Sequence, residues 1–238
     1  MTVFVPAPAT LPEGQRVYAI GDVHGCLEQL QALHAAIAAD LADRPVAQAT
    51  VIHLGDYVDR GPDCAETIGT LAGEPALAGA TIVNLMGNHE EMMIRAISTG
   101  RAEDGAHWMH NGGAESLLSW RIGRDVPQIV WATMIPFLHQ RFLRGLALFH
   151  RIGPYFFVHA GVRPGVALQE QKKEDLLWIR EPFLSFKKDL GAVVVHGHTP
   201  VRDPVVRANR IGIDTGAVLG GVLTCAILEA DRVGFLQS

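Results

Sequence analysis

The strongest constraint on the fold is a unit that occurs five times: a short apolar, β-prone run that ends in a loop rich in glycine and metal-binding side chains. The first three of these loops are residues 21–25 (GDVHG), 55–61 (GDYVDRG) and 87–90 (GNHE). In open α/β sheets, ligands bind at the carboxyl ends of the strands. We therefore expect the Asp, His and Asn side chains of these loops to meet in one shared site.

Two later loops repeat the design. The run 155–158 (YFFV) leads into His159, and the run 192–195 (AVVV) leads into residues 196–199 (HGHT). After each of the first three motifs, apolar residues recur at helical spacing, which predicts βαβ units with mostly parallel central strands. From residue 192 onward the segments are short and β-rich, and tight returns such as Gly220-Gly221 predict antiparallel pairing.

Residues 101–150 interrupt this alternation and contain three tryptophans among residues with helical spacing. We interpret them as an inserted, mostly helical cap beside the site. Residues 1–14 contain three prolines and no Lys or Arg, so we expect a loose N-terminal tail. The remainder, 15–238, is predicted to be a single catalytic domain of the α/β class, an α/β/β/α sandwich of four layers with one core.

Composition narrows the class of protein further. Of the 238 residues, 48% are apolar, which is enough for a sizeable core. The formal charge of −5 and the scattered basic residues argue against a nucleic-acid partner. The sequence contains no run of about 18 apolar residues, so we predict no membrane span. Three sparse cysteines and the lack of a signal-peptide pattern indicate a reducing, cytoplasmic location.

Mixed nitrogen and oxygen donors in the loops suit divalent Mn, Fe or Zn better than Ca. Asp22 and His24 lie two residues apart on one loop, so both can point toward the same metal. Two divalent ions about 3.5–4 Å apart clamp a phosphate and lower the pKa of a shared hydroxide. Because two such ions outweigh the charge of two carboxylates, the site would complement a phosphomonoester dianion.

Together the five motifs resemble those of the metal-dependent serine/threonine phosphatases of the phosphoprotein phosphatase family, within the metallophosphoesterases. The resemblance spans roughly residues 16–230 and is greatest to the small bacterial and phage members. It implies the metallophosphoesterase sandwich, two divalent metals (manganese, with iron or zinc as alternatives) and a phosphorylated protein or peptide as substrate. The metal ligands that it implies are Asp22, His24, Asp56, Asn88, His159 and His198, with Asp56 bridging the two ions.

The same resemblance assigns the remaining roles. It implies that His89 protonates the leaving alkoxide and that Asp59 orients His89 and keeps it charged. A carboxylate partner raises the pKa of a histidine, which suits a general acid near neutral pH. Arg60 can bind two phosphate oxygens at once, and Arg180 resembles a second phosphate-binding arginine. The implied reaction is direct attack on phosphorus by a hydroxide activated at the dinuclear centre, without a covalent phosphoenzyme.

Some assignments stay open from the sequence. His196 fits either a supporting role beside the metal ligands or an ordinary turn. Trp108, with the sequence 111–113 (NGG), resembles a segment near the substrate groove of bacterial members, although helical packing explains it equally well. Cys26 lies next to the first motif and is interpreted as a packing residue.

Two other functions are alternatives to the phosphatase hypothesis. Symmetrical diadenosine tetraphosphate hydrolases share GDVHG and a tail similar to residues 213–216 (IDTG). They usually depart from GDYVDRG and have GNHD in place of GNHE, so Asp59 and Glu90 favour the phosphatase. A catalytically inactive binding module would need a lost ligand, and all the expected ligands are present.

Overall fold

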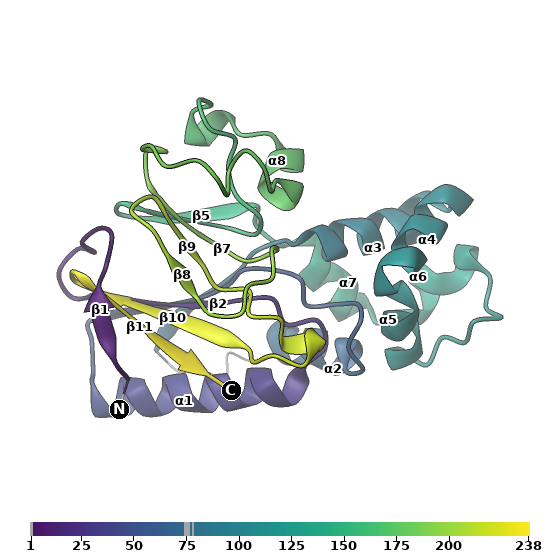
Figure 1. Cartoon of the computed structure of the whole chain (residues 1–238). Helices are drawn as coiled ribbons and strands as arrows, with labels where there is room; N and C mark the ends of the chain where they lie inside the picture. Colours follow the sequence, from purple (N-terminus) through teal and green to yellow (C-terminus); the bar gives the residue numbers. More distant parts are fainter. Residues whose placement is uncertain (1, 74–76, 78) are drawn as a thin grey trace.

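The structure is a computed structural model that describes residues 2–73, 77 and 79–238. Its strands form two mixed sheets, one of six strands and one of five (Figure 1). The first sheet has the order β1-β11-β10-β2-β3-β4. Its strands are β1 (Phe4–Pro6), β2 (Gln15–Ile20), β3 (Gln48–His53), β4 (Ala80–Asn84), β10 (Thr224–Glu229) and β11 (Arg232–Gln237).

The second sheet has the order β5-β6-β7-β9-β8. Its strands are β5 (Phe149–Ile152), β6 (Tyr155–Val158), β7 (Val193–His196), β8 (Val205–Val206) and β9 (Arg210–Gly212). The two sheets pack face to face through one apolar cluster, to which β2 contributes Val17 and Ala19 and β6 contributes Phe157.

Helices cover the outer face of each sheet, as Figure 1 shows from α1 at the bottom to α8 at the top. In β2 successive side chains point to opposite faces, so Tyr18 and Ile20 pack on the helices. These helices are α1 (Leu27–Asp43), α2 (Cys64–Ala72) and α3 (Asn88–Thr99). Leu176 of α8 (Lys173–Trp178) packs on Phe156 of β6 from the other side. The predicted α/β/β/α sandwich is therefore confirmed.

Strand direction matches the prediction in the first sheet and in part of the second. Strands β2, β3 and β4 are parallel, and β10 and β11 are antiparallel. In the second sheet β9 pairs antiparallel with β8, as predicted, but it runs parallel to β7, so the prediction of antiparallel pairing after residue 192 is wrong for that pair. After β7 the chain forms β8 at the edge of the sheet and then returns as β9, which lies between β8 and β7. Gly220-Gly221 does not join two paired strands; the tight return lies between β10 and β11.

The N-terminal segment is ordered against the body of the molecule, so the expectation of a loose tail is wrong. Strand β1 lies at the edge of the first sheet and pairs antiparallel with β11. Leu11 is buried, and the Tyr155 hydroxyl donates a hydrogen bond to the carbonyl of Ala9 (2.6 Å). The prolines are compatible with this because an edge strand tolerates a residue that cannot donate an N–H. The ring of Phe4 also lies under the guanidinium of Arg232.

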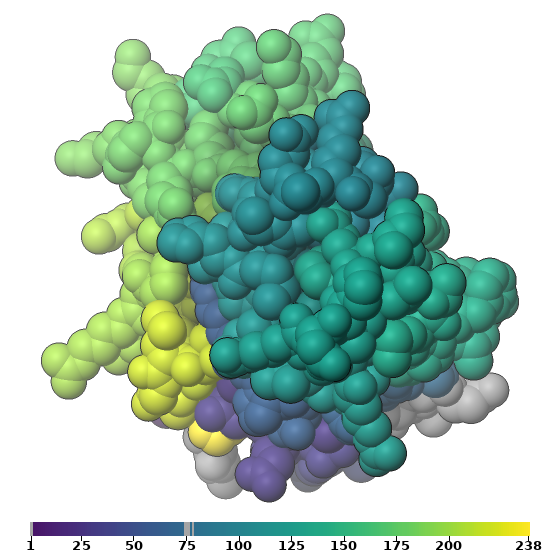
Figure 2. Space-filling model, turned by 90° about the vertical axis from the view of Figure 1, so that its right-hand side faces the viewer, coloured from purple at the N-terminus to yellow at the C-terminus, as the bar shows by residue number. Residues whose placement is uncertain are grey.

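The segment between α3 and β5 is helical, and its helices lie at one end of the sandwich (Figure 1). Figure 2 shows this segment spread over the face turned toward the viewer. Its helices are α4 (Ala102–Trp108), α5 (Ala114–Ser119), α6 (Trp131–Met134) and α7 (Phe137–Arg144). A π-type turn at Met109–Gly113 joins α4 to α5. Trp108 and Trp131 pack edge to face inside this lobe, with ring centroids 5.7 Å apart.

Candidate metal and catalytic site

The five predicted loops meet at the carboxyl ends of β2, β3, β4, β6 and β7, and their backbone is strained there. Among the described residues, five of the seven non-glycine residues with positive φ belong to these loops. Left-handed backbone costs a non-glycine residue of order 1–3 kcal/mol, and such residues cluster at functional sites. The five residues are His24, Asp56, Asp59, Arg60 and His198.

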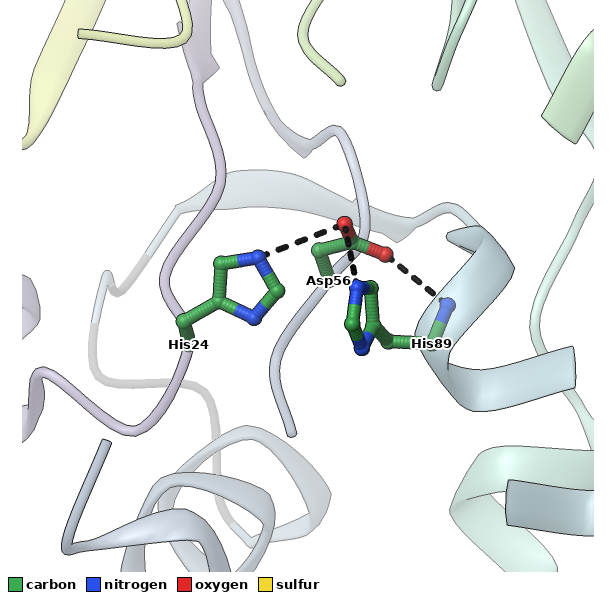
Figure 3. A group of neighbouring side chains, drawn as sticks. All are labelled: His24, Asp56 and His89. Atoms are coloured by element: carbon green, nitrogen blue, oxygen red, sulfur yellow. Dashed lines mark hydrogen bonds and ion pairs between the residues drawn. The ribbon is translucent and has the colours of Figure 1, made fainter. Parts of the chain in front are cut away.

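Asp56 lies at the centre of the site. Its Oδ2 atom is 3.4 Å from Nε2 of His24, and its Oδ1 atom is 3.4 Å from Nε2 of His159. Figure 3 shows the first of these contacts, together with the approach of His89 to the same carboxylate. Because the two oxygens face different histidines, the carboxylate has the geometry that a bridging ligand needs.

A second set of donors surrounds Asn88. Its side-chain oxygen lies 2.9 Å from Nε2 of His159 and 2.9 Å from Nδ1 of His198. The other ring nitrogen of His159 faces the carbonyl of Leu54 (3.0 Å), which fixes the orientation of the ring. Metal-binding histidines characteristically hold their second nitrogen in this way. These residues therefore lie together as the sequence predicted.

Asp22 lies beside this set but differs from the other predicted ligands. Its carboxylate accepts the backbone N–H of His198 at 3.0 and 3.1 Å. The tightest His and Asp group on the opposite side of Asp56 consists of His24, Asp56 and His89, without Asp22. The structure thus brings five of the six predicted ligands into direct proximity and holds Asp22 at the edge of the cluster.

Burial sets the protonation of the three predicted histidine ligands. It lowers the pKa of His24 and of His198 to about 3, and it also lowers the pKa of His159. All three rings are therefore neutral near pH 7, and neutral imidazole is the form that binds a metal. Their protonation is therefore compatible with the predicted role as ligands.

His89 has the opposite electrostatic environment. Burial would lower the pKa of His89, but the charge of Asp56 and the hydrogen bond with Asp59 outweigh burial and raise it. Nδ1 of His89 is 2.7 Å from Oδ2 of Asp59, and Nε2 faces Asp56 at 4.0 Å. The ring is thus held on one side by a carboxylate and presents its other nitrogen to the site, as a proton donor requires.

Asp59 is fully buried and held by two residues of the helical insert. Nε1 of Trp108 donates to both carboxylate oxygens (2.9 and 3.0 Å), and the hydroxyl of Ser116 donates to Oδ1 (2.6 Å). Nothing in the sequence indicated Ser116, because it is an ordinary helix residue outside the motifs. For Trp108, a place near the substrate groove was one of two interpretations of the sequence, and neither connected it to Asp59.

Glu90 has a structural role that the sequence did not reveal. Its carboxylate accepts the backbone N–H groups of Gly87, Asp56, Tyr57 and Val58, at distances from 2.7 to 3.2 Å. One buried side chain therefore shapes the loop that carries Asp56 and ties it to the start of α3. The final residue of GNHE was the available signal for this role.

Asp214 is a further carboxylate at the site that the sequence analysis did not assign. Burial is the main cause that raises its pKa to about 6, with a contribution from the charge of Asp56. His196 is buried but lies outside both close His and Asp groups. Its Nδ1 faces the carbonyl of Gly197 (3.1 Å), and its ring packs against Phe183. This geometry favours the supporting role over a ligand.

The two predicted phosphate-binding arginines are both exposed. Nη1 of Arg60 lies 3.1 Å from Nε2 of His24. After burial, His159 and Asp56, the charge of Arg180 is among the causes that shift the pKa of His198.

The donor set fits two divalent cations. Burial and then repulsion from Asp214 and Asp56 raise the pKa of Asp22 well above its usual value, and bound cations would relieve this repulsion. A Cβ atom added at Gly87 would collide with the carboxylate of Asp56, and one at Gly197 with that of Asp22. Glycine at these two positions leaves the room in which both carboxylates reach the site.

Comparison with known proteins agrees with this arrangement. A family model described as calcineurin-like phosphoesterase matches residues 15–229. The chain is 31% identical to serine/threonine-protein phosphatase 1 of Salmonella typhimurium, over 90% of this chain and 93% of that protein. It is 28% identical to an asymmetrical bis(5'-nucleosyl)-tetraphosphatase of Anoxybacillus flavithermus, over 86% and 87% of the two chains.

A solved structure, described as that of a candidate diadenosine tetraphosphatase, superposes with a TM-score of 0.67 at 21% identity. That match covers 98% of this chain and 99% of the other, and it shows a shared fold.

Proposed function

The chain belongs to the calcineurin-like phosphoesterases, which hydrolyse phosphate esters at a dinuclear divalent metal centre, and from that premise we propose that it is a phosphoserine and phosphothreonine protein phosphatase. The similarity to serine/threonine-protein phosphatase 1 supports this specificity. The similarity to tetraphosphatases makes a dinucleoside polyphosphate hydrolase the competing candidate.

The observation that carries the proposal is the buried pair of Asp59 and His89, joined at 2.7 Å. A serine or threonine alkoxide is a poor leaving group and needs a proton in the transition state. Cleavage of a dinucleoside polyphosphate expels a phosphate, which leaves without that help. A pair that keeps one imidazole oriented and charged therefore matches the demand of a phosphomonoester.

Each residue has a role in this proposal. When bound, two divalent ions would lower the pKa of a water molecule and neutralise the phosphate charge, and we propose manganese as the native metal. The residues that would bind these ions are Asp22, His24, Asp56, Asn88, His159 and His198. Arg60 and Arg180 bind the phosphate oxygens, and His89 gives its proton to the leaving oxygen.

Three further expectations belong to the same proposal. The substrate partner is a phosphorylated protein or peptide, and neither a nucleic acid nor a membrane is expected to bind. Across the described residues, no helix combines the length and the apolar character needed to cross a bilayer. The three cysteines are unpaired thiols, which suits the reducing cytoplasm that we propose as the location.

A side-by-side assay tests the substrate. Turnover of a phosphothreonine peptide, a phosphotyrosine peptide and diadenosine tetraphosphate is measured at one pH with added Mn²⁺. We expect kcat/KM for the phosphothreonine peptide to exceed that for the dinucleotide by at least about tenfold, or ~1.4 kcal/mol in transition-state binding. A preference for the dinucleotide would overturn the proposal. ADP as sole product would then indicate symmetrical cleavage, whereas ATP with AMP would indicate asymmetrical cleavage.

A further inference from the structure

Residues 108–116 of the helical insert contact the loop 55–61, which carries Asp59 and Arg60. The π-type turn of this segment lies against Arg60, whose backbone N–H donates to the carbonyl of Gly112 (3.2 Å). Gly112 has a φ of 103°, and a Cβ there would press on the backbone nitrogen of Arg60 at 2.9 Å. A Cβ at Gly113 would meet the indole of Trp108 at 2.7 Å. The close approach of the insert to this loop therefore depends on two glycines.

Two side chains of this segment hold Asp59 in place. The Ser116 hydroxyl accepts the backbone N–H of Asp59 (2.8 Å) and donates to its Oδ1 (2.6 Å), so it fixes backbone and carboxylate together. The Trp108 indole N–H lies within 3.0 Å of both carboxylate oxygens. Both side chains and Asp59 itself are fully buried, so no water competes for these bonds. Only Oδ2 of Asp59 faces His89.

We propose that Trp108 and Ser116 are positioning residues for the general acid, holding the Asp59 carboxylate so that it aims His89 at the leaving oxygen. This inference rests on the proposed role of His89 in phosphomonoester hydrolysis. A carboxylate without these two donors could rotate away from Nδ1 of His89, and the imidazole would lose its fixed direction. The insert is then part of the catalytic apparatus as well as a cover over one side of the site.

The test uses two small substitutions with matched controls. Trp108→Phe keeps an aromatic ring and removes the N–H, and Ser116→Ala removes the hydroxyl. Trp120→Phe removes an indole N–H that bonds to His139 (3.0 Å) in the same lobe. Ser119→Ala, on the same helix as Ser116, removes a hydroxyl that accepts the N–H of Ala65 (2.6 Å). Neither control residue contacts Asp59 in the contacts described.

The readout is the dependence of kcat on the leaving group. For a phosphoserine peptide we expect Trp108→Phe and Ser116→Ala each to lower kcat about tenfold, as expected for loss of one buried hydrogen bond that acts in the transition state. The loss with p-nitrophenyl phosphate should be much smaller, because its leaving group needs little protonation. The two controls should behave as the unmodified protein on both substrates.

A double-mutant cycle tests whether Trp108 and Ser116 act through His89. If Trp108 and Ser116 act only through the acid, neither substitution lowers kcat further when His89→Asn is already present. Equal losses on both substrates, or full additional losses in the His89→Asn background, would overturn the inference. If Trp108→Phe does not fold, Ser116→Ala decides the result alone.

A failure of this inference is separable from a failure of the proposed function. The positioning role is tested by comparing variants with one another. The proposed function is tested by the substrate preference of the unmodified protein. An unmodified protein that prefers diadenosine tetraphosphate would reject the proposed phosphatase, whatever the variants do.

Discussion

Asp56 is the residue on which most contacts of the site converge. Burial alone would raise the pKa of Asp56, but four surrounding histidines lower it well below its usual value. It is therefore ionised near pH 7, and its two oxygens face separate groups of donors. In the proposed dinuclear site, both metal positions would share its negative charge.

We predict that Asp56→Asn abolishes most activity because it removes this shared charge while keeping the side-chain size. The loss should be at least about 10²-fold, larger than for substitution of any ligand that serves a single ion. Activity and bound manganese per chain are measured together, with Asp203→Asn on the surface as control. Chelation should abolish activity of the unmodified protein and Mn²⁺ should restore it. Full activity of metal-free protein would contradict the two-metal site.

We predict that His89→Asn lowers kcat by about 10²–10⁴ with little change in KM, because a proton donor acts mainly in the transition state. The loss should be smaller for p-nitrophenyl phosphate than for a phosphoserine peptide. Steady-state kinetics on both substrates measure the difference. Equal losses on aryl and alkyl phosphates would exclude His89 as the acid.

At the scale of elements, the loop after β3 and the start of α3 form one unit through Glu90. Four backbone N–H groups point at a single carboxylate that is fully buried. A buried donor left without an acceptor costs about 1–3 kcal/mol. The conformation of the loop, and with it the place of Asp56, therefore depends on the charge and shape of this one side chain.

We predict that Glu90→Gln destabilises the fold by about 2–4 kcal/mol, because the amide offers one oxygen and turns an NH₂ group toward backbone donors. Affinity for manganese should fall as well, since Asp56 moves with the loop. Urea unfolding and metal titration measure the two effects. The neighbouring Glu91→Gln is the control, because Glu91 is only half-buried and bonds Trp178 and Lys173 outside the loop. Equal effects of the two changes would contradict this role of Glu90.

At the scale of the whole molecule, the packing of helices on the first sheet buries a histidine pair away from the site. Nε2 of His34 in α1 lies 2.9 Å from Nε2 of His53 in β3. Burial lowers the pKa of His34, and it lowers that of His53 to about 3, with a further contribution from His34. Both rings are therefore neutral in the folded protein near pH 7.

This pair should make stability depend on pH. The unfolded chain takes up a proton on His53 near pH 6.5, whereas the folded protein does so only near pH 3. Unfolding therefore binds a proton between these values, and stability falls as the pH is lowered through that window, by up to about 1.4 kcal/mol per pH unit. Urea unfolding of His53→Gln and of the unmodified protein, both with chelator, should show a shallower slope for the variant. Parallel slopes from pH 6.5 to 4 would contradict the prediction.

Much of the fold could be predicted because its signals are local in the chain. The runs that became β2, β3, β4, β6 and β7 show their apolar character over a few residues, and their loops begin at the predicted positions. The metal-binding side chains could also be recognised in the sequence. Because the strands before them end at one edge of the sheets, Asp56, Asn88 and His159 were expected to lie together, and they do. Pairing partners were harder to predict. The pairing of β1 with β11 and the parallel pairing of β9 with β7 were both missed, because the neighbour of a strand depends on packing between distant segments.

The sequence by itself determined which donors, strands and loops this protein has, since each is encoded within a few neighbouring residues. The tertiary structure alone showed how burial and the carboxylates of Asp56 and Asp59 combine to raise the pKa of His89. It alone joined Trp108 and Ser116 to Asp59, across separations of 49 and 57 residues. Contacts of that range leave no periodic or local mark in a sequence, because they form only when the insert packs against the loop.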